Sequence, residues 1–209
     1  MKTVASISSL EGWRLACASP ADLIEIRLDL LEDRDAPAVQ GALIGAQVPV
    51  ILTQRSAGEG GRFSGSVPEW QESLGPWLEH ACYVDCEIRY RDAAVPLRDA
   101  GATIIASVHR DDMPPLQELE QLEADLRTIG EIPKIVITPQ SLGDVIDLLA
   151  FTKDARKPIA TGVRGREFRF ARALLPLFGS ELVYCHAGKP TAEGQYGIGE
   201  IKLLLELLE

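Results

Sequence analysis

The sequence has no stretch that approaches the roughly 18 uninterrupted apolar residues of a membrane-spanning helix, so we expect no membrane partner. It also lacks any run of basic residues, has few aromatic residues, and carries a formal net charge of −10. A nucleic-acid surface needs clustered lysine and arginine, so this balance argues against a nucleic-acid partner. The opening segment MKTVASISSLEGW has one lysine and no apolar core, so we expect no signal peptide and a cytoplasmic location.

The sequence is also poor in the spacings that define metal and nucleotide sites. Its four cysteines, Cys17, Cys82, Cys86 and Cys185, do not form the closely spaced pairs of structural zinc sites. Cys86 lies in an apolar strand segment, where we expect it to fill core. The glycine-rich segment GEGGRFSG (58–65) matches neither the dinucleotide nor the P-loop spacing. We therefore expect no metal.

Apolar segments rich in valine and isoleucine recur along the chain, and stretches with helical spacing lie between them. These segments are TVASI (3–7), LIEIRLD (23–29), PVILTQR (49–55), YVDCEI (83–88), TIIASVH (103–109), KIVIT (134–138), PIATGV (158–163) and LVYCH (182–186). Strands that alternate with helices form parallel sheets. We therefore predict the α/β class and a (β/α)8 TIM barrel that forms one catalytic domain over residues 1–209. An open doubly wound sheet is the alternative.

Three helical segments show particular signals. Residues 116–130 place Leu116, Leu119, Leu122 and Leu126 on one face and end at Gly130 as a C-cap. Residues 141–154 begin with Ser141 as N-cap and Asp144 three positions later. Residues 199–209, GEIKLLLELLE, form another amphipathic helix.

Charged side chains lie inside the predicted strands, which is unusual for a barrel interior. Because residues two apart on a strand point to the same face, one face of several strands is polar. These shared-face groups are Glu25 with Arg27 and Asp29, Thr53 with Arg55, Asp85 with Glu87, Ser107 with His109, and Lys134 with Thr138. A purely structural salt-bridge network is one interpretation, but burial costs several kcal/mol per ion. A functional site explains the whole set better.

Two of these residues have the chemistry of a catalytic pair. Lys134 is one of six lysines and lies in an apolar strand among other cations, where it should lose its proton more easily and attack carbonyls. A lysine that extends from a strand edge to solvent is the alternative. His109 ends an apolar strand, where it serves either as an acid–base or as a satisfied core histidine. Glu87 is expected to orient its ring.

Several motifs then resemble the type I 3-dehydroquinate dehydratase family, over nearly the whole chain and in the same order. TQRSAGEGGRF (53–63) resembles the family's T-x-R-x-x-x-E-G-G segment and is the most specific match. The other matching segments are EIRLD (25–29), VDCEI (84–88), SVH (107–109), PKIVITPQS (133–141), RALLPLFGS (172–180) and TAEGQ (191–195).

The resemblance implies roles for individual residues. Lys134 would form a Schiff base with the C3 ketone of the small-molecule substrate 3-dehydroquinate, without a cofactor. His109 would move the C2 proton and help the C1 hydroxyl leave, and Arg172 would bind the substrate carboxylate. The remaining substrate-binding residues implied are Glu25, Arg27, Arg55, Thr191 and Gln195. A homodimer is a possible assembly.

Two segments depart from the family pattern. The pattern M-G-x-x-G-x-x-S-R reads RGREFRFAR (164–172) here, and the final loop has Thr191 for serine and Glu193 for proline. Glu193 would oppose an anionic substrate unless it points outward. Two rival functions therefore stay open. One is a class I aldolase-like Schiff-base barrel, and the other is a catalytically degraded barrel that acts as a binding module.

Overall fold

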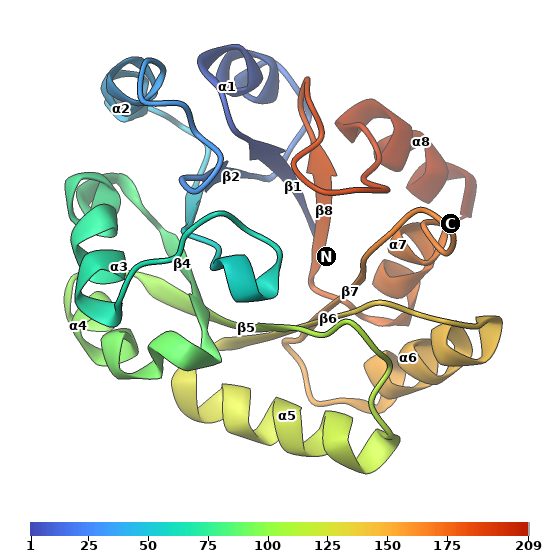
Figure 1. The fold of residues 1–209 in the computed structure, drawn as a ribbon. Coiled ribbons are helices and arrows are strands. Elements are labelled where there is room, and N and C mark those ends of the chain that lie inside the picture. The colour runs from blue at the N-terminus through green and yellow to red at the C-terminus, as the bar shows by residue number, and fades with distance from the viewer. Residues whose placement is uncertain (209) are drawn as a thin grey trace.

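The computed structural model describes residues 1–208, in which eight parallel strands form a nearly closed barrel with eight α-helices outside it (Figure 1). The strands are β1 (Lys2–Ile7), β2 (Leu23–Arg27), β3 (Val50–Thr53), β4 (Tyr83–Glu87), β5 (Thr103–His109), β6 (Ile132–Ile137), β7 (Ala160–Val163) and β8 (Leu182–His186). The helices are α1 (Leu10–Cys17), α2 (Ala36–Leu43), α3 (Val67–Leu74), α4 (Ala94–Asp99), α5 (Leu116–Ile129), α6 (Leu142–Asp154), α7 (Ala171–Leu174) and α8 (Ile198–Leu208). The predicted fold class is confirmed.

The strand order excludes the doubly wound alternative. Strands that are consecutive in the chain are neighbours in the sheet, and β1 also pairs with β8 in parallel. The remaining seam between β7 and β8 is joined by hydrogen bonds from Glu181 N to Ile159 O (2.7 Å) and from Thr161 N to the Ser180 hydroxyl (2.9 Å). A doubly wound sheet would keep two open edges, whereas here the two ends of the sheet meet.

Two strands end earlier than the sequence suggests. The apolar pattern predicts strands to residues 29 and 55, but β2 ends at Arg27 and β3 at Thr53. Beyond these points the Asp29 carboxylate accepts the backbone N–H of Arg55 (3.3 Å), so a side chain replaces the carbonyl that a ladder would use. The segments that follow β2 and β3 nevertheless continue toward the mouth of the barrel.

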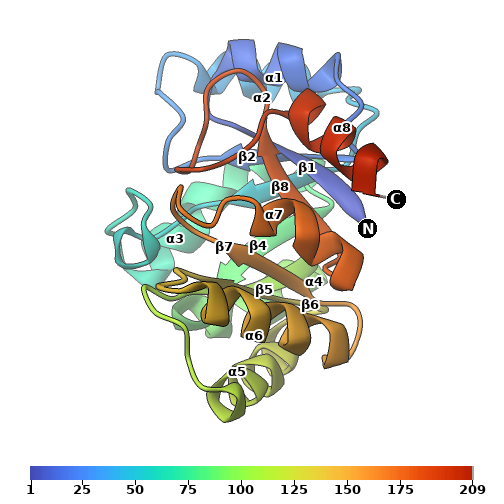
Figure 2. The ribbon, with the colours of Figure 1, turned by 90° about the vertical axis from the view of Figure 1, so that its right-hand side faces the viewer.

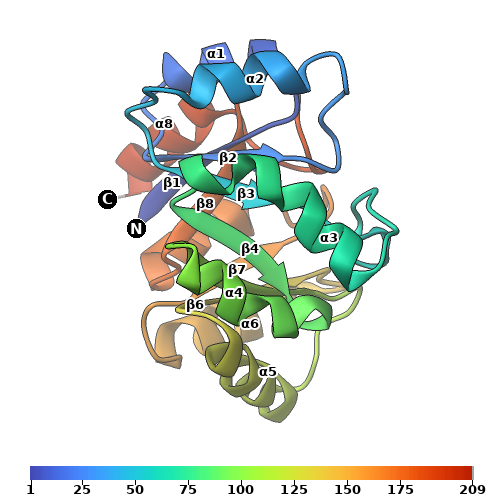
Figure 3. The same ribbon diagram turned by 90° about the vertical axis from the view of Figure 1, so that its left-hand side faces the viewer.

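The helices cover the apolar outward faces of the strands, and Figure 3 shows α3 and α4 on the side of β4. On α5, Leu119 and Leu126 are buried as predicted, whereas Leu116 is exposed and the Gly130 cap is extended. The Ser141 hydroxyl caps α6 by accepting the backbone N–H of Asp144 (3.2 Å), as the sequence predicts. Cys86 fills core in β4.

The last predicted helix, over residues 199–209, corresponds to α8, which ends at Leu208. The last residue of the predicted range, Glu209, lies outside the described residues. Among residues 1–208 no helix combines the length and the hydropathy that crossing a membrane requires. Figure 2 shows the loops that follow β3, β7 and β8 gathered at one end of the barrel, with both chain termini at the opposite end. Barrel enzymes build their sites from the loops at the carboxyl ends of the strands.

Candidate active site

The barrel interior is apolar at its amino end and polar above. A small cluster of inward apolar side chains closes the lower part, and its members are Val4, Leu23, Ile51, Ile105, Ile132, Ala160 and Leu182. The next inward residues along the strands are polar and buried, and they include Ser6, Glu25, Thr53, Asp85, Ser107 and Lys134. Above them lies a cavity of about 530 Å³ whose lining includes Lys134, His109, Arg27 and Arg172. The alternation of each strand therefore places the predicted polar set in one pocket.

Lys134 extends from β6 into this pocket, and only 6% of its side chain is exposed. Its Nζ lies 2.8 Å from Oδ2 of Asp85 on β4 and 3.9 Å from the ring centroid of Tyr184 on β8. Burial alone would raise the pKa of Asp85, but the charges of Arg55 and Lys134 overcome it and lower that pKa to about 2. The lysine is thus held at the bottom of the cavity by a permanent carboxylate and an aromatic face, and it does not extend to solvent.

Arg55 connects the carboxylates of the site. Its Nη2 lies 2.8 Å from Asp85, and its Nη1 lies 3.0 Å from Glu87 and 3.2 Å from Glu59. The side chain is 4% exposed, so these pairs are shielded from water. One arginine therefore neutralises a cluster of carboxylates that would otherwise repel one another.

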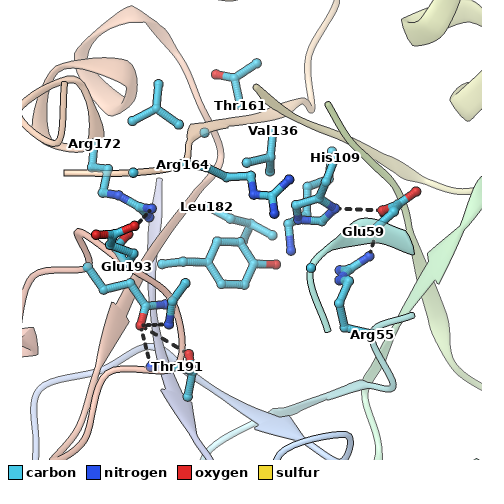
Figure 4. A pocket seen from close by; sticks show the side chains of 18 of the residues that line it. Arg55, Glu59, His109, Val136, Thr161, Arg164, Arg172, Leu182, Thr191 and Glu193 are labelled. Atoms are coloured by element: carbon cyan, nitrogen blue, oxygen red, sulfur yellow. Dashed lines mark hydrogen bonds and ion pairs between the residues drawn. The ribbon is translucent and has the colours of Figure 1, made fainter. Parts of the chain in front are cut away.

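Glu59, and not Glu87, contacts the imidazole of His109. Nδ1 of His109 lies 2.8 Å from Oε2 of Glu59 (Figure 4). Glu87 instead accepts the backbone N–H (2.7 Å) and the hydroxyl (2.5 Å) of Ser56, in addition to Arg55. The expectation that Glu87 orients the ring is therefore corrected, because its two oxygens hold the start of the loop that presents Glu59.

That loop needs its glycines for this geometry. Gly60 has a φ of 85°, a conformation that side chains other than glycine rarely adopt. At Gly61 a Cβ would lie 2.1 Å from the carbonyl oxygen of Arg55. The chain can therefore fold back over Arg55 only because residues 60 and 61 have no Cβ. The turn that these glycines permit carries the preceding Glu59 over the barrel.

Burial changes the protonation of both members of the Glu59–His109 pair. Burial, followed by the charges of Arg55 and Lys134, places the pKa of His109 well below its ordinary value. Burial also raises the pKa of Glu59 to about 8, against the opposing effect of Arg55. The imidazole is therefore neutral at neutral pH, whereas Glu59, 3.2 Å from Arg55, becomes a carboxylate as the pH rises through about 8. With Glu59 ionised, Nδ1–H donates to it and Nε2 keeps a free lone pair.

Arg172 is a partly buried cation without a carboxylate partner among residues 1–208. Its Nη2 donates to the carbonyl oxygen of Glu193 (3.3 Å), and its buried Nε has no hydrogen-bond partner in the same residues. Burial and the neighbouring charge of Arg169 lower the pKa of Arg172 to about 10. A guanidinium with an unused donor is suited to a carboxylate ligand.

The final loop is ordered by Gln195. Its Oε1 accepts hydrogen bonds from Thr191 N (2.9 Å), from the Thr191 hydroxyl (3.1 Å) and from Ala192 N (3.1 Å). The carboxylate of Glu193 lies 3.2 Å from Nε of Arg166 and is 65% exposed. Glu193, which stands where the family has proline, lines the cavity, but its carboxylate is paired with the exposed Arg166.

The other two predicted substrate-binding residues also line the cavity. Arg27 makes a two-point pair with Asp29, with both distances 2.8 Å. Glu25 accepts hydrogen bonds from the hydroxyls of Thr53 (2.8 Å) and Ser6. All nine predicted site residues except Glu87 are among the residues that line the cavity.

Three residues of the pocket are not among the predicted site residues. Glu59 lies within the quoted segment TQRSAGEGGRF, so the motif itself contained the signal. Arg164, where the family pattern has methionine, lines the cavity and pairs with Asp111 (2.7 Å). Tyr184 shares the inward face of β8 with Leu182, but nothing in the strand pattern marks it as more than core. Residues 1–208 contain no group of three or more histidine, cysteine, aspartate or glutamate side chains that could hold a metal ion.

Fold and pocket together define a (β/α)8-barrel enzyme with a buried lysine, a neutral histidine and an arginine with an unused donor around one cavity. The family model described as type I 3-dehydroquinase matches residues 6–209. The chain belongs to the type I 3-dehydroquinase family.

Individual relatives agree with this assignment. The 3-dehydroquinate dehydratase of Methanoregula boonei is 46% identical over 208 residues, and the match covers both chains completely. That of Methanospirillum hungatei is 38% identical and covers 100% of this chain and 81% of the relative. Among solved structures, the 3-dehydroquinate dehydratase of Aquifex aeolicus superposes with a TM-score of 0.84 at 25% identity, covering 100% of this chain and 99% of that one.

Proposed function

We propose that the chain dehydrates 3-dehydroquinate to 3-dehydroshikimate through a Schiff base on Lys134. The activity is that of its family, a lyase of the shikimate pathway. The single observation that carries the assignment to Lys134 is its place at the bottom of the cavity, where Nζ is 2.8 Å from Asp85. The same cavity contains the neutral His109 and the unpaired donor of Arg172.

The first step joins Lys134 to the C3 ketone. The nitrogen lone pair attacks the carbonyl carbon, and the C=O π pair moves to oxygen. The attacking amine forms when the Lys134 ammonium passes one of its three protons to water, and that proton returns to the ketone oxygen after the attack. The oxygen then leaves as water with the returned proton and a second hydrogen from the nitrogen, which leaves a cationic iminium with one N–H. Asp85 is already placed to accept that N–H and to balance the positive charge.

His109 then moves the protons of the elimination. The iminium withdraws electrons from the adjacent C2–H bond, so Nε2 of His109 can take that proton and leave an enamine. The enamine expels the C1 hydroxyl, which departs as water with the proton from Nε2. One base that becomes an acid is sufficient, and hydrolysis by water then releases the product and Lys134.

We assign the orienting role to Glu59. As a carboxylate it accepts Nδ1–H at 2.8 Å and selects the tautomer whose Nε2 is the base. Glu87 acts one step further away, because it holds Ser56 and Arg55 at the base of the Glu59 loop.

Binding of the substrate falls to cations and loop residues around the cavity. Arg172 contacts the carboxylate, since its Nε has no partner among residues 1–208. Arg27, Glu25 and Arg55 face the ring hydroxyls. Thr191 and Gln195 close the final loop, and the Gln195 amide nitrogen stays available because only Oε1 is used within that loop.

The two rival functions predict different outcomes. A class I aldolase would cleave a carbon–carbon bond and would not need the Glu59 loop, whereas this chain holds that loop with the buried Glu87. A degraded binding barrel would not need a buried lysine beside a neutral histidine. The preserved contacts of Lys134 and His109 therefore favour dehydration.

The decisive experiment is borohydride reduction in the presence of 3-dehydroquinate, followed by mass analysis of the peptide that contains Lys134. We expect a covalent adduct there and loss of activity, and Lys134→Ala should show neither adduct nor turnover. His109→Ala should still form the adduct while losing at least about 10²–10⁴-fold in rate. An adduct on another residue, or a fully active Lys134→Ala protein, would contradict the mechanism.

We further propose that the protein works in the cytoplasm. Its four cysteines are free, and Cys17 and Cys82 are exposed, which suits a reducing compartment. A homodimer stays a prediction, and light scattering coupled to gel filtration would measure the mass of the assembly.

A further inference from the structure

Tyr184 is the one aromatic side chain in contact with the nitrogen of Lys134 among residues 1–208. It lies on the inward face of β8, and its ring centroid is 3.9 Å from Nζ. Between the two strands runs β7, whose residue in register with Lys134 is the small Ala160. The tyrosine ring of β8 thus contacts the lysine of β6 past this strand. The contact is therefore built into three strands of the barrel.

The hydroxyl of Tyr184 is buried and has no hydrogen-bond partner in the part of the chain that the structure describes. A buried O–H without an acceptor is unfavourable, and such groups in native proteins call for an explanation. Tyr184 lines the substrate cavity. Arg172 also lines it, and among residues 1–208 its Nε is another buried donor without a partner. Both groups can therefore be satisfied by acceptor atoms of one ligand.

The surroundings keep this hydroxyl protonated. Burial, followed by the negative charges of Glu25 and Asp85, places the pKa of Tyr184 well above its ordinary value. The group is thus a hydrogen-bond donor throughout the working pH range and does not serve as a base.

We propose that Tyr184 is a catalytic residue of the condensation step, whose hydroxyl donates a hydrogen bond to the ketone oxygen that Lys134 attacks. The inference rests on the proposed Schiff-base function and adds a donor to it. The ring face fixes Nζ, so the hydroxyl on the edge of the same ring lies beside the carbon to which Nζ becomes bonded.

The chemistry of the step requires such a donor. When the lysine nitrogen adds to the carbonyl carbon, the C=O π pair moves to oxygen and negative charge develops there. A donor that is already in place stabilises this charge without reorganisation, as in an oxyanion hole. Tyr184 keeps its proton. The two hydrogens that leave with the oxygen as water come from the lysine ammonium, one directly and one by way of water, and the third stays on the iminium nitrogen. Atoms and charge therefore balance without another reactant.

The test is Tyr184→Phe, which removes the hydroxyl and keeps the ring against Lys134. The rate of imine formation is measured by mixing enzyme with saturating 3-dehydroquinate, quenching with borohydride at short times, and quantifying the Lys134 adduct by mass. We expect this rate to fall by about 10- to 100-fold, toward the lower range for lost oxyanion donors. The C2 proton-transfer step that follows should keep its rate, because His109 and Glu59 are unchanged.

Tyr83→Phe is the matched control. Tyr83 also lies on a barrel strand, but its hydroxyl faces Lys2 (3.4 Å) at an exposed site outside the substrate cavity. The same chemical change there should leave imine formation as in the wild type.

The outcomes separate the two proposals. If the wild type forms no adduct on Lys134, the proposed function fails. If the wild type forms it and Tyr184→Phe forms it at the same rate, only the role of Tyr184 is overturned. A variant that raises KM but reaches the wild-type rate of imine formation at saturation would also overturn it, since the hydroxyl would then contact only the bound ground state.

Discussion

Oε2 of Glu59 lies 2.8 Å from Nδ1 of His109 and 3.2 Å from Nη1 of Arg55, so one carboxylate joins the imidazole to the buried arginine. Burial raises the pKa of Glu59 to about 8 in spite of the opposing charge of Arg55, so this carboxyl gains its charge as the pH rises through about 8. The protonation of Glu59 therefore controls which nitrogen of His109 is free to accept a proton. Several measurable consequences depend on this contact.

Replacing Glu59 with glutamine should remove the acidic limb of kcat/KM. In the wild type the Glu59–His109 pair takes up a proton as the pH falls below about 8, after which Nε2 carries a hydrogen and no longer accepts the C2 proton. We therefore expect wild-type kcat/KM to decrease below that pH, and Glu59→Gln to be slow with no such limb. Glu87→Gln is the comparison, because Glu87 does not contact the ring. If Glu87→Gln abolishes the limb and Glu59→Gln does not, the assignment is wrong.

The same substitution should change the pH dependence of stability. The pKa of Glu59 is raised from 4.5 to about 8 on folding, so its contribution to stability is full below pH 4.5 and is lost as the pH rises toward 8. Glu59→Gln has no charge to bury and escapes this loss. Its free energy of unfolding relative to that of the wild type should therefore be higher at about pH 9 than at about pH 4, by on the order of a few kcal/mol. Its Tm relative to the wild type should rise in the same direction. Thermal unfolding at both pH values measures this, and an equal difference at each would refute it.

Replacing Arg172 with alanine should mainly raise KM. Its buried Nε is an unused donor among the described residues, and a desolvated charge pair with the substrate carboxylate is worth about 2–5 kcal/mol of binding. Arg166→Ala is the control, because Arg166 is exposed and pairs outward with Glu193. Steady-state kinetics of both variants check the prediction. An unchanged KM for Arg172→Ala would show that another cation, such as Arg164, holds the carboxylate.

Replacing Arg164 with methionine should move the acidic limb of kcat/KM to higher pH. Arg164 extends toward His109 (Figure 4), and burial together with the charges of Arg55, Lys134 and Arg164 lowers the pKa of that histidine. Without one of these cations the Glu59–His109 pair takes up a proton more readily, so we expect a shift on the order of one pH unit.

Arg110→Met removes a cation next to His109 in sequence that pairs outward with Asp112 (3.0 Å) and Glu118 (2.7 Å). This control should leave the limb in place. If both variants shift the limb equally, the effect reflects net charge and not the position of Arg164.

The sequence alone determined the barrel and most of its polar lining. The order of strands and the period-two alternation are local properties, so they could be read from segments such as LIEIRLD and PKIVIT before any contact was known. The same alternation placed Glu25, Asp85 and Lys134 inside, where the structure has them buried.

Only the tertiary structure decided which carboxylate meets His109. Glu87 and His109 both end neighbouring strands, which made Glu87 the natural partner by strand position. Glu59 belongs to a loop instead, and its place depends on a turn through Gly60 and Gly61 that brings the chain back over Arg55. The contact of Tyr184 on β8 with Lys134 on β6 is likewise a relationship between non-adjacent strands. Alternation along a strand predicts the face of each residue, but the approach of loops and of non-adjacent strands depends on packing among distant segments.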